Sequence, residues 1–355
     1  MHRYVRFKSF EMYRFDSDYL EGCLPEILER FKETNFEQTP GYGNDSYCAA
    51  ARELICRICE APQADVHFLV GGTQTNSTVI SFLLKPYEGV LCADNGHINV
   101  HETGAIEHGG HKVLALPGSD GKITAAQVEK AILEHRDDFC REHTVKPGMV
   151  YISFSTEFGT LYSKKELGEL SSVCSKYGIP LFIDGARLGY GLSASSCDIT
   201  IADLARLADV FYIGGTKQGA LFGEAVVFKD KAKSENFRYF IKENGALLAK
   251  GRLLGLQFEV LFRDGLYFRA AREADNKAMR IREAFKAKGC RFLTDSYTNL
   301  QFPILPNEMI EKLKRQFSFE VWNPVDESHS LTRFSTSWGT TDAAIDELTE
   351  AISQL

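Results

Sequence analysis

The sequence contains the run Leu181-Phe182-Ile183-Asp184-Gly185-Ala186-Arg187, in which three apolar residues precede an aspartate, two small residues and an arginine. An uninterrupted apolar run is typical of a strand buried on both faces, as in a mostly parallel sheet between helices. Ligands of such open sheets bind at the carboxyl ends of the strands. Asp184 and Arg187 are therefore candidates for a ligand site. The alternative is an aspartate that caps a helix and pairs with a nearby arginine.

Similar apolar runs, rich in β-branched and aromatic residues, alternate with helical patterns on both sides of this stretch. The expected strands lie at 66–70, 90–93, 112–116, 149–153, 180–183, 210–214 and 225–228. Capping boxes at Thr124 with Gln127 and at Ser163 with Glu166 predict the starts of two helices. This alternation predicts an α/β fold, with a large domain built on a mostly parallel sheet between helices.

The pattern changes after about Phe228. A charged segment, an apolar helix at 247–262 and a charged helix at 273–288 come first. Short strands near 300–304, 319–322 and 332–337 and a last helix at 342–353 follow. We expect an N-terminal segment at 1–15, a large domain at 16–245 and a small C-terminal α+β domain at 246–355.

Composition excludes several classes of protein. The chain has 355 residues, of which 44% are hydrophobic and 25% charged, as in ordinary globular proteins. Its net charge of −7 argues against a nucleic-acid-binding surface. No apolar run approaches the roughly 18 residues of a membrane span, and the first residues do not resemble a secretory signal. We expect a cytoplasmic protein.

The nine cysteines are scattered, and in a cytoplasmic protein they are expected to be free thiols. Cys56 and Cys59 have CxxC spacing but no second ligand pair nearby, so core packing is the preferred interpretation. His97 and His101 are four residues apart, but the zinc motif HExxH is absent. We therefore expect no metal site.

A glycine turn, Gly71-Gly72-Thr73-Gln74-Thr75-Asn76, follows one expected strand and precedes a helical run. Backbone N–H groups at such a helix start can bind an anion such as phosphate. The turn matches neither the dinucleotide-binding fingerprint nor the P-loop. An ordinary strand-to-helix turn remains the alternative.

A second glycine-rich turn, Tyr212-Ile213-Gly214-Gly215-Thr216-Lys217-Gln218-Gly219, places a lysine after a strand. A partly buried amine can act as a Schiff-base nucleophile, although a single loop lysine is more often a surface residue. An anion-binding turn, a strand-end aspartate and a later lysine are together the groups needed to hold pyridoxal phosphate. Gly72, Thr73 and Gln74 would bind its phosphate, Asp184 its ring nitrogen and Lys217 its aldehyde carbon.

On these motifs the chain resembles the fold type I pyridoxal-phosphate enzymes, and most closely the low-specificity threonine aldolases of the β-eliminating lyase family. The resemblance covers nearly the full length. It implies a lyase that cleaves the Cα–Cβ bond of L-threonine or L-allo-threonine. Other reactions of the same fold are alternatives: β-elimination, transamination or racemisation. A non-catalytic homologue and a nucleotide-binding oxidoreductase are less favoured.

The resemblance also implies roles for individual residues. His97, in the segment Gly96-His97-Ile98-Asn99-Val100-His101-Glu102-Thr103-Gly104, would stack on the cofactor ring, and Glu102 would act beside it. His97 is also a candidate base, with His101 or a water molecule as rivals. The expected substrate-binding residues are Ser17, Tyr42, Arg187 and Arg333. Lys250 or Arg252 would be the basic ligand of the cofactor phosphate.

Two positions depart from the family pattern. Thr216 precedes the lysine where many relatives have serine, and Ser155-Thr156-Glu157-Phe158-Gly159-Thr160 replaces a Glu-Asn pair. The second departure puts the substrate in question. The resemblance further implies a homodimer or homotetramer with sites at subunit interfaces, and an amino-acid substrate. From the net charge and the lack of a long apolar run, we expect no nucleic-acid or membrane partner.

Overall fold

The computed structural model describes residues 12–355 of the chain, and its centre is a seven-stranded sheet in the order β2-β8-β7-β6-β5-β3-β4. Only β8 runs antiparallel to its neighbours β2 and β7. The strands are β2 (Asp65–Leu69), β3 (Glu88–Ala93), β4 (Val113–Leu116), β5 (Lys146–Ser153), β6 (Leu181–Asp184), β7 (Val210–Gly214) and β8 (Glu224–Phe228).

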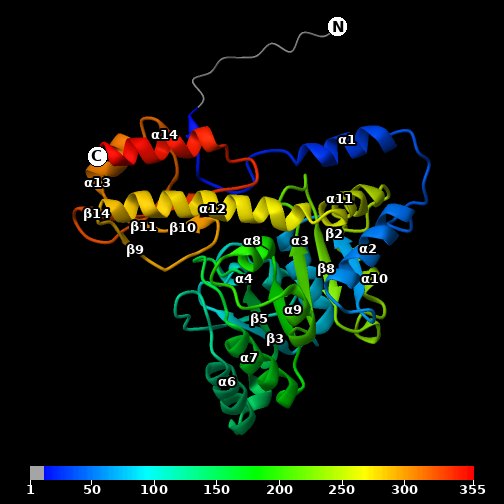
Figure 1. Cartoon of the computed structure of the whole chain (residues 1–355). Coiled ribbons are helices and arrows are strands. Elements are labelled where there is room, and N and C mark those ends of the chain that lie inside the picture. Colours follow the sequence, from blue (N-terminus) through cyan, green and yellow to red (C-terminus); the bar gives the residue numbers. More distant parts are fainter. Residues whose placement is uncertain (1–11) are drawn as a thin grey trace.

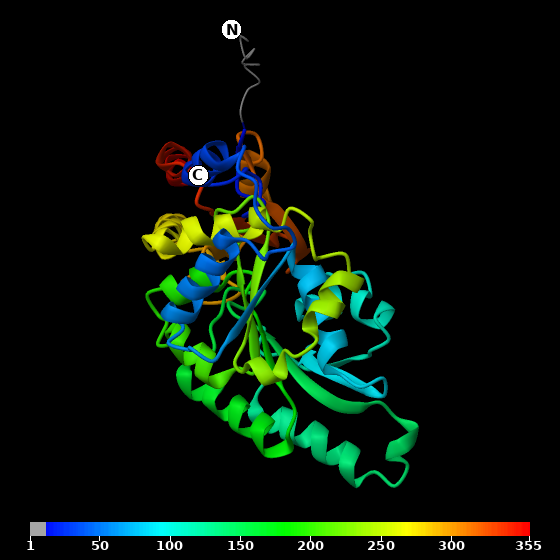
Figure 2. The ribbon, with the colours of Figure 1, turned by 90° about the vertical axis from the view of Figure 1, so that its right-hand side faces the viewer.

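Both faces of this sheet are buried, which explains why its strands are almost continuously apolar. In β7, Phe211 and Ile213 join one hydrophobic cluster, while Val210 and Tyr212 join the other. Figure 2 shows helices on either side of the strands. One face carries α2 (Ser46–Ile58), α6 (Ala125–Asp137), α7 (Lys164–Tyr177), α9 (Ile201–Leu207) and α11 (Arg252–Arg263). The other carries α3 (Gly72–Leu83), α4 (His97–Val100), α5 (Ala105–His108) and α10 (Phe237–Glu243).

A second, antiparallel sheet is formed late in the chain, in the order β10-β14-β11-β9 with β13 also paired to β14. Its strands are β9 (Arg291–Phe292), β10 (Leu300–Gln301), β11 (Pro303–Pro306), β13 (Glu320–Pro324) and β14 (His329–Ser335). A third hydrophobic cluster, with Ile281, Phe334 and Ile345, joins it to two helices, α12 (Leu266–Ala287) and α14 (Asp342–Ser353). In Figure 1 the long helix α12 runs beside α14 and reaches across to the larger sheet.

The remaining elements are short or peripheral. They are β1 (Tyr13–Arg14), β12 (Phe317–Ser318), α1 (Pro25–Thr34), α8 (Leu188–Ser193), α13 (Asn307–Leu313), and the 3-10 turns Arg141–His143 and Lys231–Lys233. Strand β1 pairs in parallel with β12, which ties the start of the described chain to its C-terminal part.

The expected α/β fold class is confirmed. All seven strands of the large sheet occur within three residues of their predicted positions, and both capping boxes are present. Two helix boundaries were wrong: α11 begins at Arg252 rather than 247, and α12 begins at Leu266 rather than 273. Gly265, in the left-handed conformation at φ 66°, separates these helices. The first turn of α12 is aromatic and packs on Phe262 through Tyr267 and Phe268. The predicted start at 273 was based on the charged residues and therefore left this turn out.

The domain boundaries after residues 15 and 245 stay predictions. Residues 1–11 of the predicted N-terminal segment lie outside the described residues. Helix α11 follows the second boundary in sequence but packs on α2. No helix within residues 12–355 has the length and apolar character of a membrane span. All nine cysteines are free, and Cys56 and Cys59 pack in or against the main hydrophobic cluster.

Candidate active site

The candidate site is centred on Asp184, the last residue of β6. The next residue, Gly185, lies very close to strand β7: a Cβ atom on it would be 1.8 Å from the carbonyl oxygen of Tyr212. Only glycine fits against the neighbouring strand β7 at this point. The close contact brings Asp184 beside the carboxyl ends of β5 and β7, where ligands of such sheets bind.

The Asp184 carboxylate is buried and accepts four hydrogen bonds. Oδ2 accepts from Tyr151 Oη at 2.5 Å and from Asn76 Nδ2 at 3.0 Å. Oδ1 accepts from the Ala186 N–H at 2.9 Å and from the Tyr212 hydroxyl. Burial opposes ionisation, but His97 and the tyrosine hydrogen bonds outweigh it and hold the pKa of Asp184 below its ordinary value. Asp184 is therefore an anion suited to a cationic partner.

His97 begins the short helix α4 and is oriented by a carboxylate. Its Nδ1 lies 2.7 Å from Glu102 Oε1, and the same oxygen accepts from Asn76 Nδ2 at 2.7 Å. Burial alone would lower the pKa of His97, but the Glu102 hydrogen bond and the charges of Glu157 and Asp184 raise it above the ordinary value. His97, Glu102, Asn76 and Asp184 thus form one connected polar group.

Lys217 lies in the turn between β7 and β8, half-buried. Its ammonium makes no hydrogen bond or ion pair with any residue in the described part of the chain. Its backbone carbonyl accepts a 2.6 Å hydrogen bond from the Tyr190 hydroxyl on α8. The preceding Thr216 donates to Glu224 Oε1 at 2.8 Å. The turn is held by its neighbours, while the amine itself is left available.

The glycine turn at 71–76 leads directly into α3, whose N-cap Gly71 provides no side-chain cap. The first N–H groups of the helix are thus available to an anion. Thr73 is exposed here, and the buried Thr75 hydroxyl has no partner. The Gln74 side chain is used elsewhere: it accepts from the Val70 N–H at 3.3 Å and donates to the Asn244 carbonyl at 2.8 Å. Gln74 therefore contributes only its backbone.

Arg187 is buried and engaged by an aspartate that the sequence did not single out. Its Nε and Nη2 lie 2.7 and 3.1 Å from the two carboxylate oxygens of Asp18. Burial opposes ionisation of Asp18, but Arg187 and Lys217 lower its pKa to about 2. Nη1 of Arg187 lies 3.9 Å from Glu157 Oε2. Only this third nitrogen is left to face a substrate.

Arg333, on β14, reaches the same short segment of chain as Arg187. Its Nη2 donates to the Asp16 carbonyl at 3.2 Å and pairs with Glu320, while its buried Nε has no partner. Between Asp16 and Asp18 lies Ser17, whose buried hydroxyl also has no partner. Three of the four predicted substrate-binding residues, Ser17, Arg187 and Arg333, thus gather around residues 16–18.

The structure does not bring Tyr42 and Lys250 to this group. The Tyr42 N–H donates to the Ala249 carbonyl at 3.1 Å, so the two segments adjoin each other. Tyr42 is exposed, and Lys250 is exposed. Arg252, the alternative phosphate ligand, donates to the Thr34 carbonyl at 2.9 Å. No hydrogen bond or ion pair among residues 12–355 joins Tyr42 or Lys250 to Asp184 or Lys217.

Several residues of the site were not predicted. Asp18 pairs with Arg187, and Asp184 accepts hydrogen bonds from Asn76, Tyr151 and Tyr212. Glu224 accepts from Thr216, the residue before Lys217. General signals in the sequence exist for the two tyrosines and for Asp18, and none exists for Asn76 or Glu224. A tyrosine in an otherwise apolar strand needs a partner for its hydroxyl, and a buried arginine needs an acid.

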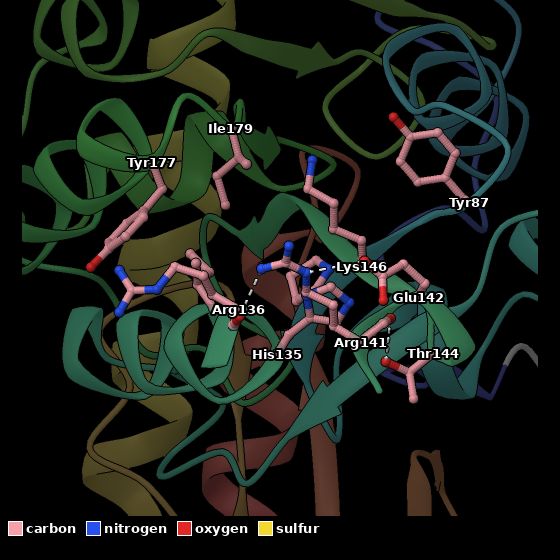
Figure 3. A pocket seen from close by; sticks show the side chains of 11 residues that line it. Tyr87, His135, Arg136, Arg141, Glu142, Thr144, Lys146, Tyr177 and Ile179 are labelled. Atoms are coloured by element: carbon pink, nitrogen blue, oxygen red, sulfur yellow. Dashed lines mark hydrogen bonds and ion pairs between the residues drawn. The ribbon is translucent and has the colours of Figure 1, made fainter. Parts of the chain in front are cut away.

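A separate cavity has a volume of about 470 Å³, and no residue of the Asp184 group lines it. Its lining residues are drawn in Figure 3. Lys146, the first residue of β5, lines the cavity, so it lies at the amino ends of the strands. Its cations already have acidic partners: Arg136 with Asp137, Arg141 with Glu142, and Lys146 with Glu88. The group around Asp184 therefore stays the candidate site.

Comparisons with known proteins identify the family of the chain. The family described as "Beta-eliminating lyase" matches residues 15–306. The chain is 30% identical to the low specificity L-threonine aldolase of a Pseudomonas species over 340 residues, which is 94% of this chain and 95% of that one. It is 29% identical to the Pseudomonas aeruginosa protein of the same name, covering 96% of each chain.

Solved structures give the same result. A threonine aldolase from Leishmania major superposes with a TM-score of 0.93 and 44% identity, covering 96% of this chain and 99% of that chain. A putative L-allo-threonine aldolase from Listeria monocytogenes has a TM-score of 0.72 at 17% identity, covering 96% of both chains, and shares the fold. The resemblance seen in the motifs is thus confirmed, and the chain belongs to the β-eliminating lyase family.

Proposed function

We propose that this protein is a pyridoxal-phosphate-dependent lyase that cleaves the Cα–Cβ bond of a β-hydroxy amino acid. L-threonine or L-allo-threonine would yield glycine and acetaldehyde. The observation that carries the proposal is the arrangement of an anionic, buried Asp184, an unpaired Lys217 amine and the His97–Glu102 pair in one site. Threonine aldolases among the relatives support the choice of substrate.

The residues present fit the cofactor. The uncapped start of α3 and the unpartnered Thr75 hydroxyl suit a phosphate, and Lys217 suits an aldehyde. Asp184 suits a protonated ring nitrogen, which would replace one of its four present donors, since a carboxylate offers about four acceptor positions. When bound, the cofactor supplies an electron-withdrawing ring that accommodates negative charge developing at Cα.

Arg187 and Arg333 hold the substrate carboxylate in this proposal. The Nη1 of Arg187 has only the longer ion pair with Glu157, at 3.9 Å, and the buried Nε of Arg333 has no partner, so both can donate to a substrate. Holding the carboxylate fixes the rotation about Cα and so determines which bond is broken. The unpartnered Ser17 hydroxyl, between the two arginine-binding residues, adds a third donor.

His97 takes the proton from the β-hydroxyl group in this proposal. Glu102 orients its ring through Nδ1, which leaves Nε2 to accept the proton. The negative neighbours Glu157 and Asp184 stabilise the positive charge that His97 then carries. His101 has its ring 5.6 Å from that of His97 and remains the alternative base.

The wider assignments are proposals as well. Lys250 and Tyr42 would act in the site of a second subunit of a homodimer or homotetramer, because they lie away from Lys217 in their own chain. A cytoplasmic location is consistent with nine free cysteines. β-Elimination, transamination and racemisation use the same groups and are the competing reactions.

The test is to purify the protein with added pyridoxal phosphate, record the absorbance band of the lysine-bound cofactor, and assay acetaldehyde release from L-threonine. We expect a band and acetaldehyde for the wild type, and neither for Lys217→Ala. Lys176→Ala, an exposed lysine paired with Glu129, is the matched control and should behave as wild type. A band without acetaldehyde, together with turnover of serine, cysteine or a 2-oxo acid, would reject the aldolase.

A further inference from the structure

Glu224 is a buried carboxyl directly behind the Lys217 turn. It is the first residue of β8 and only 3% of its surface is exposed. Its Oε2 accepts from the Gly215 N–H at 3.1 Å, and its Oε1 accepts from the Thr216 hydroxyl at 2.8 Å. The Thr216 hydroxyl oxygen in turn accepts from the Gly223 N–H at 3.1 Å. One side chain thus ties the two residues before Lys217 to the start of β8.

The position of Glu224 in the sheet connects two parts of the site. In the strand register it lies opposite Gly214 on β7 and opposite Leu69 on β2. Gly214 precedes the lysine turn, and Leu69 precedes the glycine turn that leads into α3. Glu224 therefore sits between the segments proposed to bind the aldehyde end and the phosphate end of the cofactor.

Glu224 can gain or lose its proton close to pH 8. Burial raises its pKa to about 8, although the hydrogen bonds from Thr216 and Gly215 and the charge of Lys217 oppose the rise. The other titratable groups that face it are Asp184, Tyr212 on β7 and Tyr267 on α12. The two tyrosines are buried with raised pKa values, so near pH 8 they are neutral, and the charges that act on Glu224 are those of Lys217 and Asp184.

We propose that Glu224 is a positioning residue that holds the Lys217 turn and, through its own charge, controls how readily the Lys217 amine reacts. This inference rests on the proposed role of Lys217. To bond the aldehyde carbon, the lysine must first give up a proton as a free amine; a C=N bond then forms and water leaves. An ionised neighbour stabilises the ammonium form and reduces the free amine, whereas a neutral Glu224 does not.

Glu224→Gln tests the proposal, because glutamine imitates the neutral carboxyl. Its carbonyl can accept from Gly215 and its amide can donate to the Thr216 oxygen. Apoenzyme is mixed with pyridoxal phosphate from pH 6 to 9.5, and the rate at which the lysine-bound band appears is measured. We expect the variant to lose one ionisation from the wild-type pH profile and to react at least 3-fold faster at pH 9.

Two further measurements separate this role from a structural one. Pyridoxamine phosphate occupies the same site without bonding to lysine, so its affinity should change less than 3-fold in the variant. The unfolding midpoint of wild-type apoprotein should fall as pH rises from 6 to 9, because the folded state holds a proton that the unfolded chain releases near pH 4.5. Glu224→Gln should lack this fall. Glu88→Gln, a buried carboxyl paired with Lys146 at the other end of the sheet, should keep the wild-type profile.

Unchanged profiles in Glu224→Gln, or equal losses of pyridoxamine phosphate and pyridoxal phosphate binding, would overturn the proposal. If Glu224→Gln does not fold, variants of Thr216, whose hydroxyl donates to Glu224, replace it in the test. Thr216→Ser keeps the hydroxyl and should match the pH profile of the wild type, whereas Thr216→Val removes it and should shift that profile. A Thr216→Val profile equal to wild type would then overturn it. A wild type without a lysine-bound band would instead reject Lys217 itself, before any question about Glu224 arises.

Discussion

Glu102 and Asp184 accept hydrogen bonds from the same atom, the amide nitrogen of Asn76, at 2.7 and 3.0 Å. Two buried carboxylates are thus linked through one donor, which offsets part of their mutual repulsion. Because Glu102 also holds His97, the proposed base is linked through Asn76 to the proposed partner of the ring nitrogen.

Asn76→Ala should weaken both functions together. Without the shared donor, the pKa of Asp184 should rise and His97 should lose part of its orientation. A buried acceptor left without its donor costs about 1–3 kcal/mol, so we expect kcat/KM to fall roughly 10- to 100-fold. Steady-state kinetics measures this effect. Asn307→Ala, an exposed asparagine in the C-terminal part, is the control, and a similar loss there would contradict the role of Asn76.

Asp18→Asn should destabilise the fold and disorder Arg187. Removing one partner of a buried ion pair costs about 3–5 kcal/mol, because the remaining charge is left unpaired. Thermal unfolding should show a clearly lower midpoint, with a raised KM. Arg57→Gln breaks an exposed pair with Glu53 and should change stability by less than about 1 kcal/mol. Equal midpoints for the two variants would argue against the Asp18–Arg187 pair.

The same pair predicts how stability depends on acid. The pKa of Asp18 falls from 3.8 in the unfolded chain to about 2 in the fold, so its contribution is complete above pH 3.8. It is lost as the pH falls through 2, and amounts to about 2 kcal/mol. The difference in acid unfolding between wild type and Asp18→Asn should therefore shrink by about 2 kcal/mol as the pH falls from 4 to 2. A constant difference between them from pH 5 to 2 would refute this.

Glu102→Gln should move the acid side of the kcat/KM profile to lower pH. Burial lowers the pKa of His97 and Glu102 raises it, with a net rise above 6.5. A base works in its neutral form, so in the wild type activity should increase as pH rises above 6.5. Without the Glu102 charge, His97 is neutral at lower pH, although overall activity should fall because the ring is less well oriented. An unmoved acid limb would mean that another group is the base.

Arg333→Lys should raise KM more than it lowers kcat. Lysine keeps the charge but cannot present a planar, forked donor to a carboxylate. We expect roughly a 10- to 100-fold loss in kcat/KM, as for one charge-assisted hydrogen bond. Arg291→Lys, an exposed arginine on β9, is the matched control. If both variants show wild-type KM values for threonine, Arg333 does not bind the substrate carboxylate.

The large sheet was predictable because its strands are buried on both faces, and their composition alone distinguishes them. The two-residue strands β1, β9 and β12 were not, since so short a pairing depends on distant partners such as Phe317 for Tyr13. The same distinction holds within the site. Lys217 and Asp184 are marked by their local sequence, whereas Tyr151 and Tyr212 reach Asp184 only because β5, β6 and β7 are neighbours.

Residues that hold others in place leave the weakest trace in a single sequence. Asp18 resembles any acid in a polar segment until Arg187 is buried against it. Glu224 begins an apolar strand and is recognisable only when the turn before β8 is folded back over it. A sequence motif therefore identifies the groups that react more easily than the residues that orient those groups or change their pKa values.

The binding of Arg333 to the Asp16 carbonyl joins residues 317 positions apart and has a consequence for the order of assembly. At about 5–20 residues per second, a ribosome needs roughly 16 to 60 s to travel from one to the other. During that interval Lys217 and Arg187 emerge and the large sheet can form, but Arg333, the second proposed ligand of the carboxylate, is still missing. A nascent or prematurely released chain therefore holds the aldehyde-binding lysine before its grip on the amino-acid carboxylate is complete, so full substrate selection is acquired last.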